Sequence, residues 1–284
     1  KQPTTAGEVT FGVDLTGFST RVTQDGSSWN DGDKIGTYVL DMKTLEPVTE
    51  AANVPYVCSE EGASVSFTST TPLKVQNDGT PVKFVAYYPY NADVRNFNYP
   101  VQLAAQERGS TACDLLYAAT KEEYTYSPEN EPHISLNFTH RLAKVILKFV
   151  NMEKEPLEVS DVRIEGMQTA ASFNIQTDVL TVDESSVATI NPYHNATTGF
   201  YEAIILPSAL TDSYKVSFVL DDREKEWIFT NLDIALPQFH KGYSYTFALY
   251  IDDSGFVEMG RLENVEGGNS SAPWEDGSSE DGTA

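Results

Sequence analysis

The alternation of hydrophobic and polar residues predicts a chain built from short β-strands. Val9, Phe11, Val13 and Leu15 alternate with polar or small residues, which is the period-two pattern of a half-buried strand. Further strands are predicted at Ile35–Leu40, Phe84–Tyr88, Val145–Phe149, Val216–Leu220 and Tyr243–Ile251. Many short strands separated by turn residues favour β-sandwiches over a βαβ fold.

Turns and helices add little to this picture. Asp31-Gly32-Asp33 and Asp221-Asp222 are typical of turns, the second within a hairpin. Leu103–Gln106 and Leu115–Lys121 could each form a turn or two of helix, and Gly109 separates them. The expected fold class is therefore all-β.

The length of 284 residues and the number of strands predict two sandwich domains in tandem. The polar segment Ser127–Pro132 contains two prolines, as a linker or a long loop would, and a new strand follows it. We therefore expect domains at 1–135 and 136–262, with the boundary near residue 135.

The last segment, 263–284, differs in composition. It holds six acidic residues, no lysine or arginine, four glycines and four serines. Such a segment has little apolar surface to offset its ordering entropy, so we expect a flexible acidic tail. Trp274 is its one large apolar side chain. The sequence leaves open whether this ring docks on the protein or is exposed to solvent.

Composition and charge narrow the range of partners. Hydrophobic residues make up 40% of the chain, enough for a real core, and the net charge is −23. Such an acidic chain is repelled by nucleic-acid phosphates and anionic lipid, so neither is an expected partner. No stretch approaches the roughly 20 apolar residues of a membrane helix.

No motif for catalysis, metal binding or cofactor binding stands out. The chain has no GxSxG, HExxH, GxxxxGK[ST] or GxGxxG sequence. Asp25, Asp31 and Asp33 could supply oxygens to calcium, but their spacing does not fit a calcium loop, and a turn explains them better. We expect no enzyme activity, no cofactor and no metal. Cys58 and Cys113 could form a disulfide or remain thiols.

Aromatic residues are abundant, with 15 Tyr, 14 Phe and 3 Trp. Tyr87, Tyr88, Tyr90 and Tyr99 form a local cluster together with Phe97. These rings could stack on a sugar or a protein partner, or they could pack inside a sandwich. Packing is the simpler interpretation, and a binding patch is the alternative.

An ordered series of short motifs runs along the chain. The most distinctive is Phe138–Val145, with the pattern F-x-H-x-L-A-K-V. The others, in chain order, are Trp29–Gly36 with Tyr38, Phe84–Tyr90, Asp114–Ala118, Gly166-Met167, Ala203–Ser208, Gly242–Phe247 and Pro273–Gly277. Together these motifs resemble the fimbrillin-like family, surface lipoproteins and type V pilus subunits of Gram-negative gut and oral anaerobes, and the resemblance spans nearly the whole chain.

The resemblance implies two tandem transthyretin-like β-sandwich domains. It also implies export, lipid attachment of the precursor at a cysteine, and display on the outer membrane at the cell surface. The expected partners are other pilus subunits or surface proteins, and a host protein or glycan. Contact with the membrane is expected only through the lipid anchor.

The resemblance also implies assembly by strand exchange. In the pilus-forming members of the family, an Arg-specific protease cuts after the first strand, and a strand from the next subunit fills the groove by β-augmentation. The matching first strand here is Val9–Leu15, with Val9, Phe11, Val13 and Leu15 facing the core. Arg21, followed by Val22, is the candidate cleavage site, and an ordinary solvated arginine is the alternative.

The donor side is weaker. Residues after Ile251 do not alternate cleanly, and the tail is acidic, so this segment makes a poor donor strand. We therefore expect a tip, anchor or accessory subunit more than a stalk subunit. The alternative function is a surface glycan- or protein-binding module that uses exposed aromatic residues.

Overall fold

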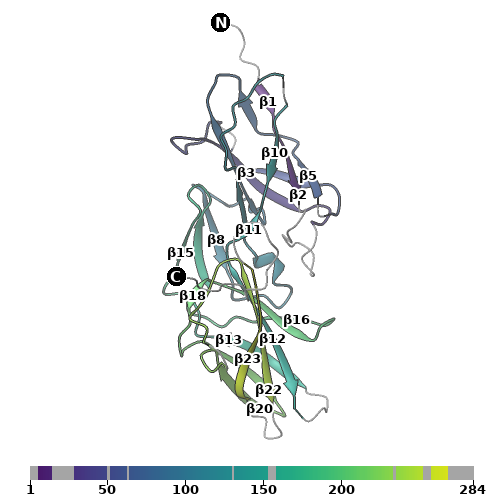
Figure 1. Ribbon diagram of the computed structural model, residues 1–284, viewed down its shortest axis with the longest axis vertical. Coiled ribbons are helices and arrows are strands. Elements are labelled where there is room, and N and C mark those ends of the chain that lie inside the picture. The colour runs from purple at the N-terminus through teal and green to yellow at the C-terminus, as the bar shows by residue number, and fades with distance from the viewer. Residues whose placement is uncertain are drawn as a thin grey trace, which may run out of the picture. The chain divides into compact units, whose positions relative to one another are not determined.

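The computed structural model is almost entirely β-structure (Figure 1). It describes residues 6–14, 29–49, 52–62, 64–129, 131–152, 158–232, 235–251 and 257–267. Within these ranges, the only helical element is one 3-10 turn, η1 (Thr111–Cys113). The predicted all-β class is confirmed. The described residues form two compact units. The first unit is drawn from residues 1–99, 115–140 and 173–179, and the second from residues 100–114, 141–172 and 180–284.

The first unit is built around an eight-stranded sheet. In spatial order its strands are β10 (His133–Leu136), β2 (Thr10–Asp14), β5 (Ser64–Thr68), β4 (Val54–Cys58), β3 (Lys34–Asp41), β7 (Val82–Tyr88), β9 (Leu116–Ala119) and β11 (Thr139–His140). The outermost strands, β10 and β11, are separated by only two residues in sequence, so the sheet curls round until its edges approach each other. A smaller sheet pairs β1 (Ala6–Glu8) with β6 (Lys74–Gln76).

The curled sheet encloses an aromatic-rich core. Trp29 lies at its centre and is fully buried, with edge-to-face contacts to Phe67, Tyr88 and Phe138. Alternation along β3 places Ile35 and Val39 in this core and Tyr38 on the opposite face. The period-two pattern in the sequence thus accounts for the core of this unit.

The second unit contains a five-stranded sheet and a three-stranded sheet. The first has the order β16 (Tyr193–Asn195), β17 (Phe200–Ile205), β12 (Ala143–Asn151), β22 (Tyr243–Ile251) and β23 (Val257–Gly267). The second has the order β13 (Val159–Glu165), β19 (Lys215–Leu220) and β20 (Arg223–Ile228), and β18 (Ser208–Ala209) pairs with β21 (Gln238–Phe239). Residues of both sheets form one hydrophobic core, which includes Val145, Phe218, Trp227 and Phe247.

A further sheet contains β15 (Val179–Val182), β14 (Ala170–Asn174) and β8 (Asn98–Gln102), and its residues are divided between the two units. The chain passes from the first unit to the second between His140 and Arg141, but each unit also includes residues from elsewhere in the sequence. A linear boundary near residue 135 is therefore still a prediction.

Most of the predicted strands are observed, and two segments differ from expectation. Leu115–Lys121 was considered able to form a turn or two of helix, but Leu116–Ala119 forms strand β9, paired between β7 and β11. Residues 263–267, expected to begin the flexible tail, belong to β23, which pairs with β22. In both segments, pairing with a neighbouring strand outweighs local composition. The remainder of the predicted tail lies outside the described residues.

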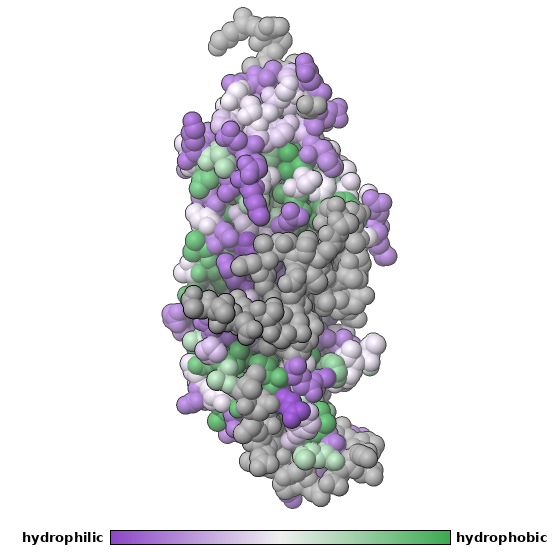
Figure 2. Space-filling model, in the orientation of Figure 1, coloured by the Kyte–Doolittle hydropathy of each residue, from purple (hydrophilic) through white to green (hydrophobic). Residues whose placement is uncertain are grey.

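The predicted turns are confirmed. Asp221 and Asp222 connect β19 to β20 with φ values of 50° and 59°, the left-handed conformation of a two-residue hairpin turn. At Asp31-Gly32-Asp33, the Asp33 carboxylate accepts a hydrogen bond from the Asn30 N–H at 2.6 Å. Both cysteines are free thiols. On the face of the molecule that Figure 2 shows, most of the described surface is hydrophilic, and the hydrophobic side chains lie in small groups.

Candidate functional site

The first strand of the large sheet is an internal strand. β2 pairs in parallel with β10 and antiparallel with β5. Phe11 lies opposite Ile134 in the first pairing and opposite Phe67 in the second. Just before it, β1 pairs with β6 in a different sheet, so the chain changes sheets at Val9 (Figure 1). Removal of β2 would therefore leave unpaired backbone groups on two neighbouring strands.

The inward side chains of this strand belong to the core. Val9 and Phe11 are fully buried and Val13 nearly so. The Phe11 ring makes edge-to-face contacts with Tyr56 at 4.8 Å and with Phe84 at 5.8 Å between centroids. Burial of a side chain of this size stabilises a fold by about 1.5–3 kcal/mol. The strand thus fills a groove whose walls are apolar and aromatic.

A buried tyrosine fixes the point where the chain changes sheets. The Tyr56 hydroxyl donates to the Val9 carbonyl at 2.9 Å and accepts from the Leu73 N–H at 2.8 Å. Burial raises the pKa of Tyr56 to about 12, so the hydroxyl remains a donor at physiological pH. One side chain therefore satisfies two backbone groups that β-pairing leaves unpaired.

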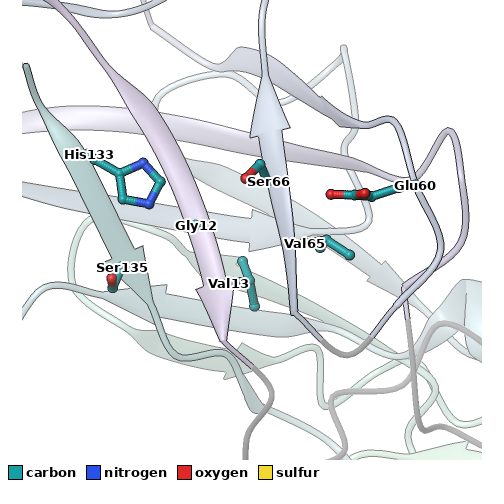
Figure 3. A pocket seen from close by; sticks show the side chains of 7 residues that line it. All are labelled: Gly12, Val13, Glu60, Val65, Ser66, His133 and Ser135. Carbon is teal, nitrogen blue, oxygen red and sulfur yellow. The ribbon is translucent and has the colours of Figure 1, made fainter.

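The outer face of the same three strands forms a shallow polar pocket of about 290 Å3 (Figure 3). His133 and Ser135 come from β10, Ser66 from β5, and Glu60 from the loop before β5. Gly12 of β2 lies between the flanking strands. Thr10 Oγ1 lies 3.0 Å from His133 Nδ1, which links β2 to β10 through side chains.

Gly12 allows a close approach of the histidine. A Cβ built at Gly12 would lie 2.7 Å from His133 Nε2, inside van der Waals contact. Any side chain at this position would therefore displace the imidazole ring. The first strand thus carries a defined pattern of large residues inward at 9, 11 and 13 and no side chain outward at 12.

The structure describes part of the predicted first-strand site. Val9, Phe11 and Val13 lie together in the core, as their alternation predicts. Leu15, Arg21 and Val22 lie outside the described residues, so cleavage after Arg21 stays a prediction. The sequence did not identify Tyr56, Gly12 or His133, because they meet only when segments more than 40 residues apart pair in the sheet.

The four predicted patch tyrosines occupy different environments. Tyr87 is fully buried and Tyr88 nearly so, and as neighbours on β7 they face opposite sides of the sheet. The Tyr87 hydroxyl donates to Asn53 Oδ1 at 2.6 Å, and the Tyr88 ring packs on Trp29. Tyr90 and Tyr99 are half-buried, and Tyr99 packs against Tyr87 at 5.3 Å. Burial leaves Tyr87 and Tyr88 little surface with which to stack on a ligand.

The described residues offer neither a metal site nor a membrane-spanning helix. In the part of the chain that the structure describes, no three His, Cys, Asp or Glu side chains gather as metal ligands would. Among those same residues, no helix is long and apolar enough to span a bilayer.

Comparison with known proteins then decides the family. A family model described as fimbrillin-like matches residues 20–274, most of the chain. The chain belongs to the fimbrillin-like family. The resemblance seen in the sequence motifs is therefore confirmed, and membership of this family implies a location at the cell surface. No curated protein gives a significant sequence match.

Solved structures support the fold of this fimbrillin-like protein. A proposed cell adhesion protein of Bacteroides uniformis aligns with a TM-score of 0.71 at 21% identity, covering 88% of this chain and 94% of that one. A second proposed cell adhesion protein, from Bacteroides ovatus, aligns with a TM-score of 0.68 at 16% identity, covering 94% of this chain and 98% of that one. A fimbrial protein of Bacteroides ovatus aligns with a TM-score of 0.51 at 17% identity, covering 87% of this chain and 50% of that one. At these identities the likeness establishes the fold.

Proposed function

We propose that this fimbrillin-like protein is a non-enzymatic fimbrial subunit or adhesin of the cell surface that assembles by β-strand exchange. Its precursor would carry a lipid anchor at the outer membrane. Its partners would be other pilus subunits or surface proteins, with a host protein or glycan as a further ligand. The observation that carries the proposal is the position of β2, a first strand inserted between two later strands.

The energetics of the groove support exchange. A sheet that loses an internal strand exposes apolar core and two rows of backbone groups, and a new strand restores both. Because β2 precedes every other described strand of its sheet in sequence, a single cut between Asp14 and Trp29 would release it without dividing any of those described strands. Arg21 lies in this interval.

The C-terminal strand supports a tip, anchor or accessory position. β23 pairs with β22 of its own chain, with Tyr243 opposite Gly267. Lys148 forms an ion pair with Glu263, and Leu262 packs on the core of the second unit. A donor strand must leave its own unit to reach a neighbour, whereas these residues are engaged within theirs. A stalk subunit would need residues beyond 267 as its donor.

Limited digestion with trypsin tests the proposal, with an Arg21→Gln variant as the matched control. We expect the wild-type protein to acquire a new N-terminus at Val22, and the trimmed protein to bind an added peptide of residues 1–21 as a replacement strand. The variant should keep its own first strand under the same digestion and should not bind the peptide. Clean loss of residues 1–21 from a folded product that binds no added strand would contradict strand exchange.

A further inference from the structure

A second pocket in the first unit shares no lining residue with the pocket over Gly12. It has a volume of about 450 Å3 and lies where β3 meets Pro47, the pair Ala52-Asn53 and the segment 90–97. Its aromatic and polar lining residues are Tyr38, Asn53, Tyr90, Arg95, Asn96 and Phe97. Small-molecule sites commonly have volumes of about 300–1,000 Å3 and combine aromatic walls with a few polar groups.

One wall of this pocket is aromatic. The rings of Tyr38 and Phe97 pack at 4.7 Å between centroids, and Tyr90 lines the same space. Tyr38 is buried beneath Phe97, so it supports the wall from the sheet. An aromatic wall of this kind offers an apolar surface to the C–H face of a sugar ring.

Arg95 supplies the charge of the pocket. Its Nη1 donates to the carbonyls of Ala92 at 2.7 Å and Val94 at 2.9 Å, which fixes the guanidinium. Arginine has five N–H donors, so Nε and Nη2 retain three, and the described residues provide these with no hydrogen-bond acceptor. None of the described residues that line the pocket is acidic, although the chain carries a net charge of −23. A fixed guanidinium in such a site matches a carboxylate.

The pocket walls are held in place before any ligand arrives. Asn53 accepts from the Tyr87 hydroxyl at 2.6 Å and donates to the Asn91 carbonyl at 2.9 Å. Asn53, Asn96 and Phe97 have φ values of 53°, 50° and 61°, a conformation that side chains other than glycine adopt rarely. A preorganised site loses less entropy when it binds.

We propose that this pocket binds an acidic sugar, a sialic or hexuronic acid, with its carboxylate on Arg95 and its ring against the aromatic wall. This binding is independent of strand exchange, because the pocket involves neither β2 nor its neighbours β10 and β5. The intact protein would therefore bind the sugar before any cleavage.

Saturation-transfer NMR and calorimetry on the intact protein test this site with 3′-sialyllactose, glucuronic acid and lactose. We expect one of the two acids to bind at least roughly tenfold more tightly than neutral lactose. Arg95→Gln should remove that preference, and Arg95→Lys should reduce it because the planar fork is lost. Arg223→Gln, a change to an exposed arginine in the second unit, is the matched control and should leave binding unchanged.

Three results would overturn the proposal. They are equal binding of lactose and both acids, an unchanged preference in a folded Arg95→Gln variant, and no binding of either acid at millimolar concentration. Thermal melting of each variant establishes that it is folded. Binding by sialyllactose alone or glucuronic acid alone would identify which acidic sugar the pocket selects.

Discussion

At the scale of single residues, Tyr56 makes the clearest contribution to holding the first strand. Its hydroxyl forms hydrogen bonds with both the Val9 carbonyl and the Leu73 N–H. Tyr56→Phe therefore leaves these two buried backbone groups without partners. The expected loss is about 1–3 kcal/mol in the free energy of unfolding, measured by chemical denaturation. Tyr126→Phe, at a ring that packs on the same core, should change stability little. Equal stability of Tyr56→Phe and wild type would show that these hydrogen bonds do not hold the strand.

The same residue predicts a dependence on alkaline pH. Burial raises the pKa of Tyr56 from 10.0 to about 12, and that of Tyr245 in the second unit likewise to about 12. Between pH 10 and pH 12 the folded state keeps a tyrosine proton that the unfolded state has released. The contribution of this group to the free energy of unfolding is therefore fully present below pH 10 and falls as pH rises towards 12. Denaturation midpoints across this range measure the fall, which should be shallower in Tyr56→Phe. A midpoint that stays constant up to pH 12 would contradict this.

Two glycines should respond differently to substitution. A Cβ at Gly36 would lie 2.2 Å from the ring of the fully buried Tyr87, which cannot move aside. We expect Gly36→Ala to cost about 1–3 kcal/mol. Gly12→Ala meets the exposed ring of His133, which can rotate into solvent, so its cost should be smaller. Thermal melting of the two variants checks the order, and the reverse order would refute this account of the packing.

At the scale of elements, a buried polar contact connects three neighbouring strands of the second unit. Lys144 on β12 lies 2.7 Å from Glu202 on β17, with each side chain 10% exposed. Asn195 on β16 donates to the same carboxylate at 2.9 Å. The contact therefore fixes the register of β16, β17 and β12 on the face away from the hydrophobic core.

Substitutions at this contact should be strongly non-additive. Glu202→Leu alone leaves the lysine charge buried and is expected to cost about 3–5 kcal/mol. The double variant Lys144→Met/Glu202→Leu removes both charges and should recover most of that loss. A double-mutant cycle by urea denaturation measures the coupling, and additive losses would contradict a coupled buried pair.

The sequence predicted elements well where alternation was strong, as in Tyr243–Ile251, which matches β22 residue for residue. It predicted less well where pairing partners decide the structure. Leu116–Ala119 looks helical locally and becomes a strand because β7 and β11 flank it. The pocket at Arg95 was not predicted for the same reason, because its walls come from Tyr38, Asn53 and the segment 90–97, which are distant in sequence. Of the predicted aromatic cluster, Tyr90 and Phe97 line it, whereas Tyr87, Tyr88 and Tyr99 do not.

At the scale of the whole molecule, the protein is a member of a cell-surface family in which one unit is completed by its own first strand. The family and the fold follow from sequence motifs and strand pattern together. Exchange of the first strand is the step that would convert this self-contained chain into an assembling one. The acidic-sugar pocket would let the same unit bind a glycan with the first strand in place.

Isotope exchange of the first strand tests this central claim most directly. The protein is cut after Arg21 and incubated with an excess of an isotopically heavy peptide of residues 1–21, and the mass of the complex is followed by native mass spectrometry. The account predicts that the heavy peptide replaces the light fragment in the cut protein and does not enter the intact protein. A Val13→Asp peptide, which would bury a charge in the groove, should fail to replace it. Retention of the light fragment, or its loss without uptake of the heavy peptide, would contradict strand exchange.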